Sequence, residues 1–363
     1  MTVVVPLLAV AVLALAWGRQ VPPLAEVAIA GLLAGSVLAA VHHAETVAHR
    51  VGEPFGSLIL AVAVTVIEVG LIVSVMLSGG PGTESLARDT VFAAVMITCN
   101  GIVGLALLIG ALRRRVAMFN AEGTGAALAT VMTLAALCLV LPTFTTSAPG
   151  PTFSPAQLVF AAIVSLALYG LFVFVQNIRH RDYFLPPHGG ELEEAIGGDQ
   201  PRHDGEHAAP PSTRSALASL ALLVAALVGV VGLAKVESKT IEEAVTGVGL
   251  PASFVGVIIA VLVLLPETLA AVRNALRDRV QISLNLALGS AMASIGLTIP
   301  TIAVVSIWLP GPLLLGLGSV QIALLVLTAA VGILTVMPGR STLLQAAVHL
   351  VLCAAFVFLA ANP

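Results

Sequence analysis

Long uninterrupted apolar runs constrain this chain more than any other feature of its sequence. Ten runs of 18 to 27 residues and one shorter first run are spaced along its 363 residues. An α-helix needs about 20 apolar residues to cross a hydrocarbon core about 30 Å thick. We therefore predict an all-α polytopic membrane protein of about eleven transmembrane helices, over residues 3–17, 24–41, 56–77, 90–112, 124–141, 156–178, 215–234, 252–272, 281–305, 311–337 and 342–361.

The composition supports this prediction. Only 10% of the residues are charged, whereas soluble domains carry about 25%. The apolar runs are continuous rather than alternating, which argues against a membrane β-barrel. No basic stretch is long enough to follow a nucleic-acid backbone, so nucleic acid is not an expected partner. The three cysteines all lie inside apolar runs, and we expect buried apolar side chains rather than disulfides or metal ligands.

The first run, residues 3–17, has two interpretations. Ala14-Leu15-Ala16 resembles a signal-peptide cleavage site, but no basic residue precedes the run. Signal peptides carry such a basic segment. We therefore expect residues 1–20 to form a retained extra helix.

One long polar segment, residues 179–214, divides the chain. Its Pro-Pro and Gly-Gly pairs disfavour a packed fold. We predict a flexible linker between a first half, residues 21–178, and a second half, residues 215–363. A solvated loop is the favoured interpretation, although a regulatory cation-binding loop could be formed by its ionisable residues: His180, His188, His203, His207, Glu191, Glu193, Glu194, Asp199, Asp204 and Glu206.

Lys and Arg are distributed unevenly between the two sets of loops. If the N-terminus is cytoplasmic, the outside loops hold only Arg19, Arg88, Lys235 and Lys239. Because cytoplasmic loops carry the excess of Lys and Arg, we expect the N-terminus and the linker to be cytoplasmic and the C-terminus to be outside. The inside loops then hold Arg50, Arg113, Arg114, Arg115, Arg179, Arg181, Arg202, Arg214, Arg273, Arg277, Arg279 and Arg340.

The two halves are related by an inverted repeat. Five spans lie on each side of the linker once the first span is set aside. Because five is odd, the second half must cross the membrane in the opposite orientation to the first. Aligning Phe55 with Phe254 places Glu68 on Glu267 without a gap. The corresponding segments are residues 52–112 and 250–305, and this architecture is typical of secondary transporters.

Glu68 and Glu267 are the acidic residues that lie deep within apolar spans. An ionisable residue at that depth is costly and indicates a functional site. Pro266 removes a backbone donor beside Glu267, so we expect a broken helix with freed carbonyls there. Two carboxylates with carbonyl and hydroxyl oxygens predict a site for a hard cation, most naturally Ca²⁺. Paired buried carboxylates also favour protonation when no cation is bound, so the simplest scheme exchanges one Ca²⁺ for about two protons.

Polar groups also occur in the span that follows each glutamate. Asn100 lies in the first half, and Ser290 and Ser294 lie in the second. Their oxygens could complete the coordination or hydrogen-bond the glutamates. Small and polar residues also pack membrane helices, and the sequence supports both roles equally.

His42, Glu45 and His49 fall on one helical face just before the third span. Because His titrates near neutrality, this face could pass protons to the site or sense the internal pH. The alternative is a solvated turn at the membrane surface, which the sequence slightly favours.

Three stretches carry a family resemblance: HHAETVAHRVGEPFGSLILAVAVTVIEVGLIVSVM, RDTVFAAVMITCNGIVGL, and LPETLAAV followed by NLALGSAMASIGLTIP. They resemble the bacterial ChaA-type cation/proton antiporters of the Ca²⁺:cation antiporter superfamily, and the resemblance covers nearly the whole chain. It implies an extra first helix, two inverted five-helix halves, a bacterial inner-membrane location and cation efflux driven by proton entry, with no cofactor. It places the conserved glutamates of that family on Glu68 and Glu267.

The sequence departs from the Gly-Asn-Ala-x-Glu form that is common in calcium/proton exchangers. The corresponding stretches here are Val-Thr-Val-Ile-Glu, ending at Glu68, and Val-Leu-Leu-Pro-Glu, ending at Glu267. Thr65 stands where relatives often place an amide, which makes it a further candidate ligand. The missing amides leave Na⁺(K⁺)/H⁺ antiport as the alternative to Ca²⁺/H⁺ antiport.

Other function classes have less support in the sequence. No His-Glu-x-x-His motif is present, and His349 has no evident nucleophile partner, which argues against an intramembrane enzyme. The sequence lacks a Gly-rich phosphate-binding loop, which argues against a nucleotide-driven pump. Two inverted halves in one chain argue against a channel built from a ring of subunits. The expected partners are membrane lipid, the transported Ca²⁺, Na⁺ or K⁺, and protons, and a homo-oligomer stays open.

Overall fold

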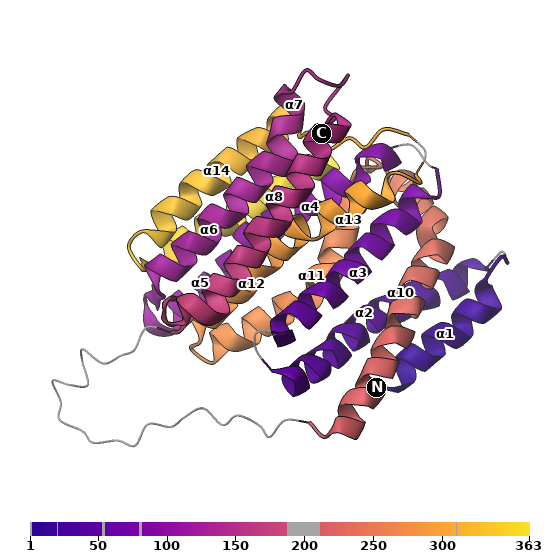
Figure 1. Ribbon diagram of the computed structural model, residues 1–363, viewed down its shortest axis with the longest axis horizontal. Coiled ribbons are helices and arrows are strands. Elements are labelled where there is room, and N and C mark those ends of the chain that lie inside the picture. The colour runs from indigo at the N-terminus through magenta and orange to yellow at the C-terminus, as the bar shows by residue number, and fades with distance from the viewer. Residues whose placement is uncertain (1, 20, 53–54, 80–81, 187–210, 310) are drawn as a thin grey trace.

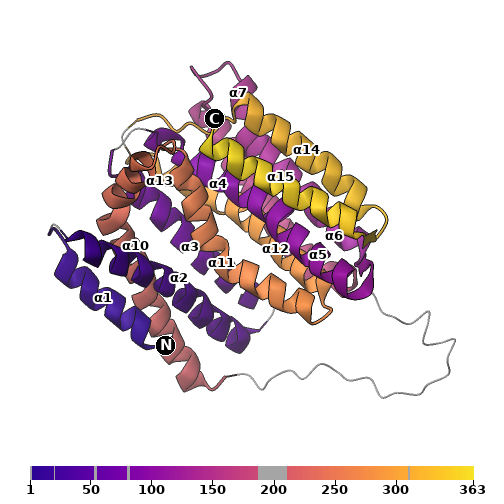
Figure 2. The ribbon, with the colours of Figure 1, turned by 180° about the vertical axis from the view of Figure 1, so that it is seen from behind.

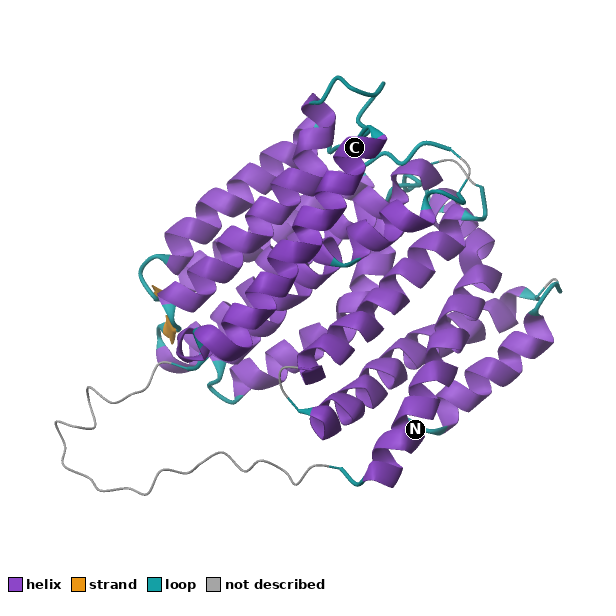
Figure 3. Cartoon of the chain, in the orientation of Figure 1, coloured by secondary structure: helices purple, strands orange, loops and turns teal. Residues whose placement is uncertain are grey.

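The computed structural model describes residues 2–19, 21–52, 55–79, 82–186, 211–309 and 311–363. Within these ranges the regular structure is helical apart from one ribbon of two strands, each two residues long (Figure 3). The helices pack side by side in a bundle, with the two chain ends at opposite ends of it (Figure 1). Ten of the described helical segments are long and apolar enough to cross a membrane. The prediction of an all-α polytopic membrane fold is confirmed.

Five membrane-crossing units of the first half follow the short helix α1 (Val4–Ala16). Three of the units contain a π-helical turn. In chain order the elements are α2 (Pro23–Val51), α3 (Phe55–Met76), the 3₁₀ turn η1 (Thr83–Ser85), α4 (Leu86–Met96) with η2 (Ile97–Ile102) and α5 (Val103–Arg114), α6 (Ala121–Ala135) with η3 (Ala136–Val140) and α7 (Leu141–Phe144), and α8 (Pro155–Phe174) with η4 (Val175–Arg179).

The second half also has five membrane-crossing units. They are α10 (Thr213–Gly247), α11 (Phe254–Leu276), α12 (Val280–Gly296) with α13 (Thr298–Val305), α14 (Ser319–Val336) and α15 (Leu343–Ala361). The helix α1 packs against this half as well as against α2, since Gly229 and Gly232 of α10 approach Ala9 and Leu13 of α1 too closely to admit a Cβ atom. The short first helix is therefore part of the bundle.

The two halves place α3 and α11 at corresponding positions. Each helix begins at a Phe and carries its Glu thirteen residues later, about 20 Å along the helix axis. The helix α3 packs against α12 and α13 of the second half, and α11 packs against α4 and α5 of the first. The prediction of two inverted five-helix halves is therefore confirmed.

One end of the bundle gathers most of the arginine-bearing loops, and we call it the basic face. The strand β1 (Ala117–Met118) after α5 pairs antiparallel with β2 (Arg340–Ser341) before α15. Arg50 at the end of α2 donates a hydrogen bond to Thr213 at the start of α10. Loops that the Lys and Arg distribution grouped on one side of the membrane therefore lie together.

A third contact on the basic face joins the α5 end to the loop between α11 and α12. Arg113 and Arg114 pair with Asp278 at N···O distances of 3.2 and 3.3 Å. Because both arginines donate to it, the pKa of the Asp278 carboxyl is lowered from its ordinary value. The charge of Asp278 is thus retained throughout the neutral pH range.

The expected break at Pro266 is wrong. The helix α11 runs without interruption from Phe254 to Leu276, with Pro266 inside it. A proline still withholds a backbone bond from the carbonyl one turn earlier, but neighbouring transmembrane helices allow a helix to continue past it. The break lies instead at Leu297, between α12 and α13, where Pro300 cannot donate to the carbonyl of Gly296.

Two helices extend beyond their predicted ends. The helix α2 continues through the His-bearing segment to Val51, and α10 continues to Gly247. The interpretation of residues 42–51 as a turn is therefore wrong, and Lys235 and Lys239 belong to α10 rather than to a loop. Hydropathy ends a span at its first polar residues, whereas the helical backbone bonds continue into the membrane surface.

The segment before α14 is extended, although the sequence predicted a helix from residue 311. Gly316 and Leu317 donate backbone bonds to the carbonyls of Pro151 and Leu139 in the first half. These bonds between the halves replace intrahelical ones, so α14 begins only at Ser319.

Only the ends of the predicted linker fall within the described residues. At its start the 3₁₀ turn η5 (Arg181–Phe184) packs on the bundle, with Phe184 edge-on to Phe172 and 6% exposed. The Phe184 carbonyl accepts a bond from the Asn285 side chain. Residues 187–210, which include most of the candidate cation-binding loop, lie outside the described residues.

Candidate functional site

Glu68, in the middle of α3, is held by two hydroxyl groups from the second half. Its Oε2 accepts hydrogen bonds from Ser294 Oγ at 3.0 Å and from Thr298 Oγ1 at 2.7 Å. Ser294 belongs to the last turn of α12, and Thr298 is the first residue of α13. The Glu68 side chain is 1% exposed. The helix break at Leu297 therefore lies where the second half contacts the Glu68 carboxylate.

Glu267, in the middle of α11, has different surroundings. It is 8% exposed, and its Oε2 is buried with no hydrogen-bond partner among the described residues. The side chain lines a cavity of about 280 Å³, together with Ser290 of α12. An unpaired buried carboxylate oxygen is costly. A ligand that enters the cavity would meet the Glu267 side chain, whose Oε2 has no partner among the described residues.

The two glutamates act on one another electrostatically. The charges of Glu68 and Glu45 both bear on the Glu267 carboxyl group. Glu45 in turn interacts with His42, His49 and Arg273. The charges at the end of α2 thus bear on Glu267 electrostatically.

His42, Glu45 and His49 are exposed on α2, and they share one side of that helix as the sequence predicted. They belong to a regular helix that continues to Val51. Their part in proton transfer or pH sensing stays a prediction, and the electrostatic influence of Glu45 on Glu267 supports it.

Asn100 and Thr65 are bonded elsewhere. The Asn100 amide contacts Thr328 of α14 and His349 of α15 rather than either glutamate. Thr65 donates its hydroxyl to the Ala61 carbonyl one turn back, at 2.8 Å. Of the four additional candidates, the structure brings Ser294 to Glu68 and Ser290 to the Glu267 cavity. Asn100 and Thr65 hydrogen-bond to groups other than the two glutamates.

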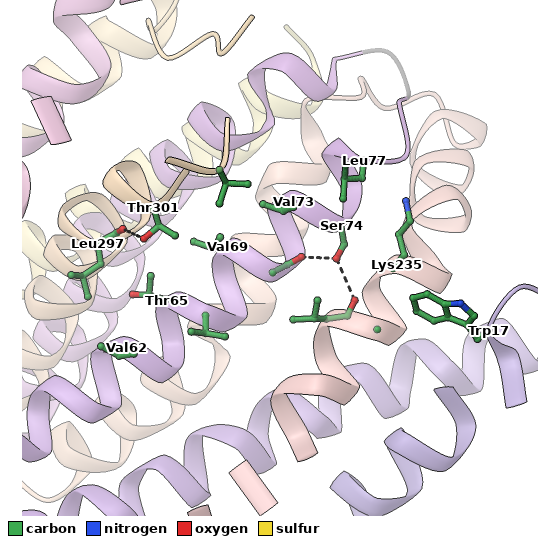
Figure 4. Close-up of a pocket in the computed structure, with 15 residues that line it drawn as sticks. Trp17, Val62, Thr65, Val69, Val73, Ser74, Leu77, Lys235, Leu297 and Thr301 are labelled. Carbon is green, nitrogen blue, oxygen red and sulfur yellow. Dashed lines mark hydrogen bonds between the residues drawn. The ribbon is translucent and has the colours of Figure 1, made fainter. Parts of the chain in front are cut away.

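Thr65 borders a larger apolar groove on the other side of α3 (Figure 4). The groove has a volume of about 640 Å³, and α3, α10 and α13 contribute most of its wall. The hydroxyls of Ser74 and Thr301 in this wall are satisfied by backbone carbonyls. The groove therefore offers apolar surface and has no carboxylate lining it.

The described residues contain no group of three or more His, Cys, Asp or Glu side chains that could hold a metal ion. A cation at this site would therefore depend on the carboxylates of Glu68 and Glu267 with hydroxyl, carbonyl or water oxygens. This is the oxygen chemistry that hard cations prefer.

Thr298 is the contact that sequence reasoning missed. The signal was Pro300 within the span 281–305. A proline inside a span indicates an interruption of the helix, and Thr298 lies two residues before it. The prediction assigned the interruption to Pro266 and did not consider Pro300.

Comparison with known proteins places this chain in a family. A family model described as sodium/calcium exchanger protein matches residues 23–177 and 218–361. The two matched regions coincide with the two five-helix halves. The chain belongs to the sodium/calcium exchanger family. It is a multi-pass membrane antiporter of the Ca²⁺:cation antiporter superfamily, as the sequence resemblance implied.

Three relatives are similar in sequence. The y4hA protein of Sinorhizobium fredii is 46% identical, over 99% of this chain and 95% of the relative. The sodium-potassium/proton antiporter ChaA of Escherichia coli is 32% identical, over 98% of this chain and 94% of the relative. A Ca²⁺/H⁺ antiporter of Aphanothece halophytica is 25% identical, over 63% of this chain and 61% of the relative.

Solved structures share the fold at low sequence identity. Native YfkE superposes with a TM-score of 0.71 at 16% identity, covering all of both chains. The H⁺/Ca²⁺ exchanger CAX superposes with a TM-score of 0.66 at 16% identity, covering 99% of this chain and 91% of that one. A sodium-calcium exchanger gives 0.54 at 17% identity, covering 92% and 99%. At these identities the likeness shows the fold alone.

Proposed function

We propose that this protein exchanges a cation for protons at Glu68 and Glu267, with Ca²⁺/H⁺ exchange as its principal activity. The observation that carries the proposal is the buried Oε2 of Glu267, which has no partner among the described residues and belongs to a side chain that lines a cavity between the two halves. A buried carboxylate oxygen without a donor is costly. Binding of either a cation or a proton removes that cost.

The pairing of two carboxylates favours a divalent cation. Glu68 and Glu267 together would neutralise one Ca²⁺. The hydroxyls of Ser294 and Thr298 touch Glu68, and Ser290 lies on the Glu267 cavity. Ca²⁺ takes roughly 6 to 8 oxygen ligands in flexible geometry, and water in the cavity would supply those that the side chains do not.

Competition between the cation and protons would couple their transport. Both carboxylates are buried at membrane depth, where a bare charge is disfavoured. When the cation leaves, proton binding discharges the site, and when protons leave, the cation returns. The site is electrically neutral in either state if two protons replace one Ca²⁺, and this supports movement of the loaded site across the bilayer.

Access to Glu267 would come from the basic face. Ser57 at the start of α3, Gln176 of η4 and Asn285 of α12 line the cavity between that face and Glu267. We propose that the basic face is cytoplasmic, because Lys and Arg accumulate on cytoplasmic loops. Glu45, with His42 and His49 beside it, would then carry protons between Glu267 and the cytoplasm.

Na⁺(K⁺)/H⁺ exchange at the same site is the second candidate. The ChaA relative, which is 32% identical to this chain, is named a sodium-potassium/proton antiporter. A monovalent cation needs only one charged carboxylate, and Glu267 has the unpaired oxygen. In that case one proton would replace one cation.

Proteoliposomes with a preset pH gradient test the proposal. Vesicles that contain the purified protein should move protons when Ca²⁺ is added to the side with the lower proton concentration. Protein-free vesicles should not. Adding Na⁺ or K⁺ in parallel separates the two candidates. Proton movement with Na⁺ or K⁺ but not with Ca²⁺ would replace the first candidate with the second. Absence of proton movement with all three cations would refute both.

A further inference from the structure

A fully buried polar cluster lies outside the proposed cation site, between η2, α14 and α15. Figure 2 shows α14 and α15 side by side, with α5 next to α15. Asn100 Nδ2 donates to Thr328 Oγ1 at 2.9 Å, and Asn100 Oδ1 lies 3.2 Å from His349 Nδ1. His349 Nε2 lies 3.1 Å from Thr335 Oγ1. The four side chains are at most 2% exposed. We call these four residues the Asn100 cluster.

The bonds of the cluster occupy both ends of the Asn100 amide. With Oδ1 as acceptor, His349 Nδ1 carries the hydrogen, and Nε2 accepts from the Thr335 hydroxyl. Reversing the amide would exchange donor and acceptor roles but would still leave both ends bonded. In either orientation, partners on two helices therefore hold the Asn100 amide group in place.

Asn100 lies within a π-helical turn. The segment η2 covers Ile97–Ile102, between the α-helices α4 and α5. A π turn is rare and occurs mostly as a single turn at functional sites. Gly101 and Gly104 lie beside it and face Cys353, Leu350 and His349 at distances that leave little space for a Cβ atom. The glycines thus allow α15 to approach closely enough for His349 to reach Asn100.

The segment that holds Asn100 contacts the helices of the proposed cation site and also the last two helices of the chain. The segment η2 contacts α11 and α12 on one side and α14 and α15 on the other. In the other half, Ser294 of the corresponding unit bonds to Glu68. Asn100 bonds to α14 and α15 instead, and Glu267 retains an unpartnered oxygen.

From this asymmetry, and resting on the proposed function, we infer that His349 is a positioning residue for the cation site. Together with Thr328 it holds the Asn100 amide on the α14–α15 side and keeps an amide oxygen away from Glu267. The site then binds its cation weakly enough to release it within the transport cycle. Releasing Asn100 adds a ligand, tightens cation binding and slows release.

The inference distinguishes His349 from a residue that only packs helices. Buried polar side chains do join membrane helices, and loss of such a contact lowers the amount of folded protein without improving cation binding. A positioning role instead predicts tighter binding on removal of His349, and it predicts that this gain depends on Asn100.

Equilibrium binding of ⁴⁵Ca²⁺ to the purified full chain tests the inference separately from transport. The His349→Phe/Thr328→Val variant should bind Ca²⁺ about tenfold more tightly, which is the scale of one additional oxygen contact to a charged group. Its maximal exchange rate should fall. Adding Asn100→Ala to the same variant should abolish the gain. His349→Gln, which retains a donor for the Asn100 amide, should bind like the wild type.

Thr90→Val is the matched control. Thr90 lies on α4 in the same unit, is fully buried, and its hydroxyl has no partner among the described residues. Its removal should leave Ca²⁺ binding unchanged. Unchanged or weaker binding by folded His349→Phe/Thr328→Val protein would overturn the inference, as would a gain that persists without Asn100. Wild-type protein that binds Ca²⁺ without exchanging protons would refute the proposed function and leave the binding comparison valid. Absence of Ca²⁺ binding by the wild type would overturn the inference too.

Discussion

Glu68 and Glu267 occupy corresponding places in the two halves, yet their carboxyl groups have opposite surroundings. Glu68 accepts two hydroxyl bonds and is 1% exposed. Glu267 lies on a cavity and has a buried oxygen without a partner among the described residues. An inverted repeat therefore does not give the two carboxylates equal surroundings. One carboxylate is oriented by hydroxyl donors of the other half, and the other has an oxygen without such a donor.

The difference suggests a division of work within the proposed site. Fixed hydroxyl donors orient Glu68, so little reorganisation is needed when a cation binds beside it. Glu267 is reached from the cavity and would exchange its proton or cation first. Substitutions that change the surroundings of one glutamate at a time therefore separate the two roles.

Replacing Glu267 with Gln should have the largest effect. The amide retains the shape of the side chain but removes the charge that faces the cavity. A contact with a charged group is worth up to about 3 kcal/mol, so we expect a loss of apparent cation affinity of up to about 100-fold. Cation-dependent proton movement in proteoliposomes measures it. Glu68→Gln should cause a comparable loss, and full activity in either variant would remove that residue from the site.

Removing the hydroxyl donors of Glu68 should have a smaller effect. Ser294→Ala and Thr298→Val each delete one hydrogen bond to a buried carboxylate, and a bond of this kind contributes about 1.5 kcal/mol. We expect roughly tenfold weaker apparent cation affinity in each variant. The Thr65→Val variant is the control, because the Thr65 hydroxyl bonds to a backbone carbonyl within α3. An equal loss in Thr65→Val would show that Thr65 is also a ligand.

Narrowing the cavity should slow exchange without changing the carboxylates. Gly289 of α12 lines the Glu267 cavity, and a Cβ atom there would meet open space. Gly289→Leu should therefore fold and reduce the initial rate of exchange several-fold. Gly170→Leu is the matched control, since Gly170 of α8 also faces open space and does not line this cavity. Equal rates in the two variants would argue against access through the cavity.

The smallest effect should come from Asp278→Asn on the basic face. Arg113 and Arg114 lower the pKa of Asp278. A carboxyl group whose pKa is lowered by folding stabilises the fold at every pH above its ordinary pKa of about 3.9. That stability is lost only as the pH falls through the lower pKa of the folded state. The profile of exchange across the neutral pH range should therefore be the same in Asp278→Asn and wild type. A shifted profile would place a coupling group on this face.

The sequence was sufficient for the architecture and for the central pair. Apolar run length determines where helices cross a membrane, so the ten long helices could be predicted, although α2 and α10 end later and α14 begins later than the apolar runs indicate. Glu68 and Glu267 were identifiable because an ionisable residue stands out in such a run. The gap-free alignment of Phe55 with Phe254 then related the two halves, and the structure places both glutamates thirteen residues after these phenylalanines.

The remainder of the site depends on features that hydropathy does not register. Thr298 reaches Glu68 because α12 ends one turn before Pro300, and which of the two prolines interrupts its helix depends on neighbouring helices. Asn100 was predicted near the site from its depth. A π turn adds a residue and rotates the side chains that follow, so depth alone did not indicate which helices its amide would meet.

Two helices are too long for the membrane they cross. At 1.5 Å per residue, the 29 residues of α2 extend about 44 Å and the 35 residues of α10 about 52 Å, whereas a hydrocarbon core measures about 30 Å. Such helices tilt or project into the headgroups, and the tilt follows the thickness of the bilayer. The helix α10 packs along α3, which carries Glu68. We therefore expect the rate of exchange to depend on the thickness of the surrounding lipid, because a change in the tilt of α10 would alter its packing against α3.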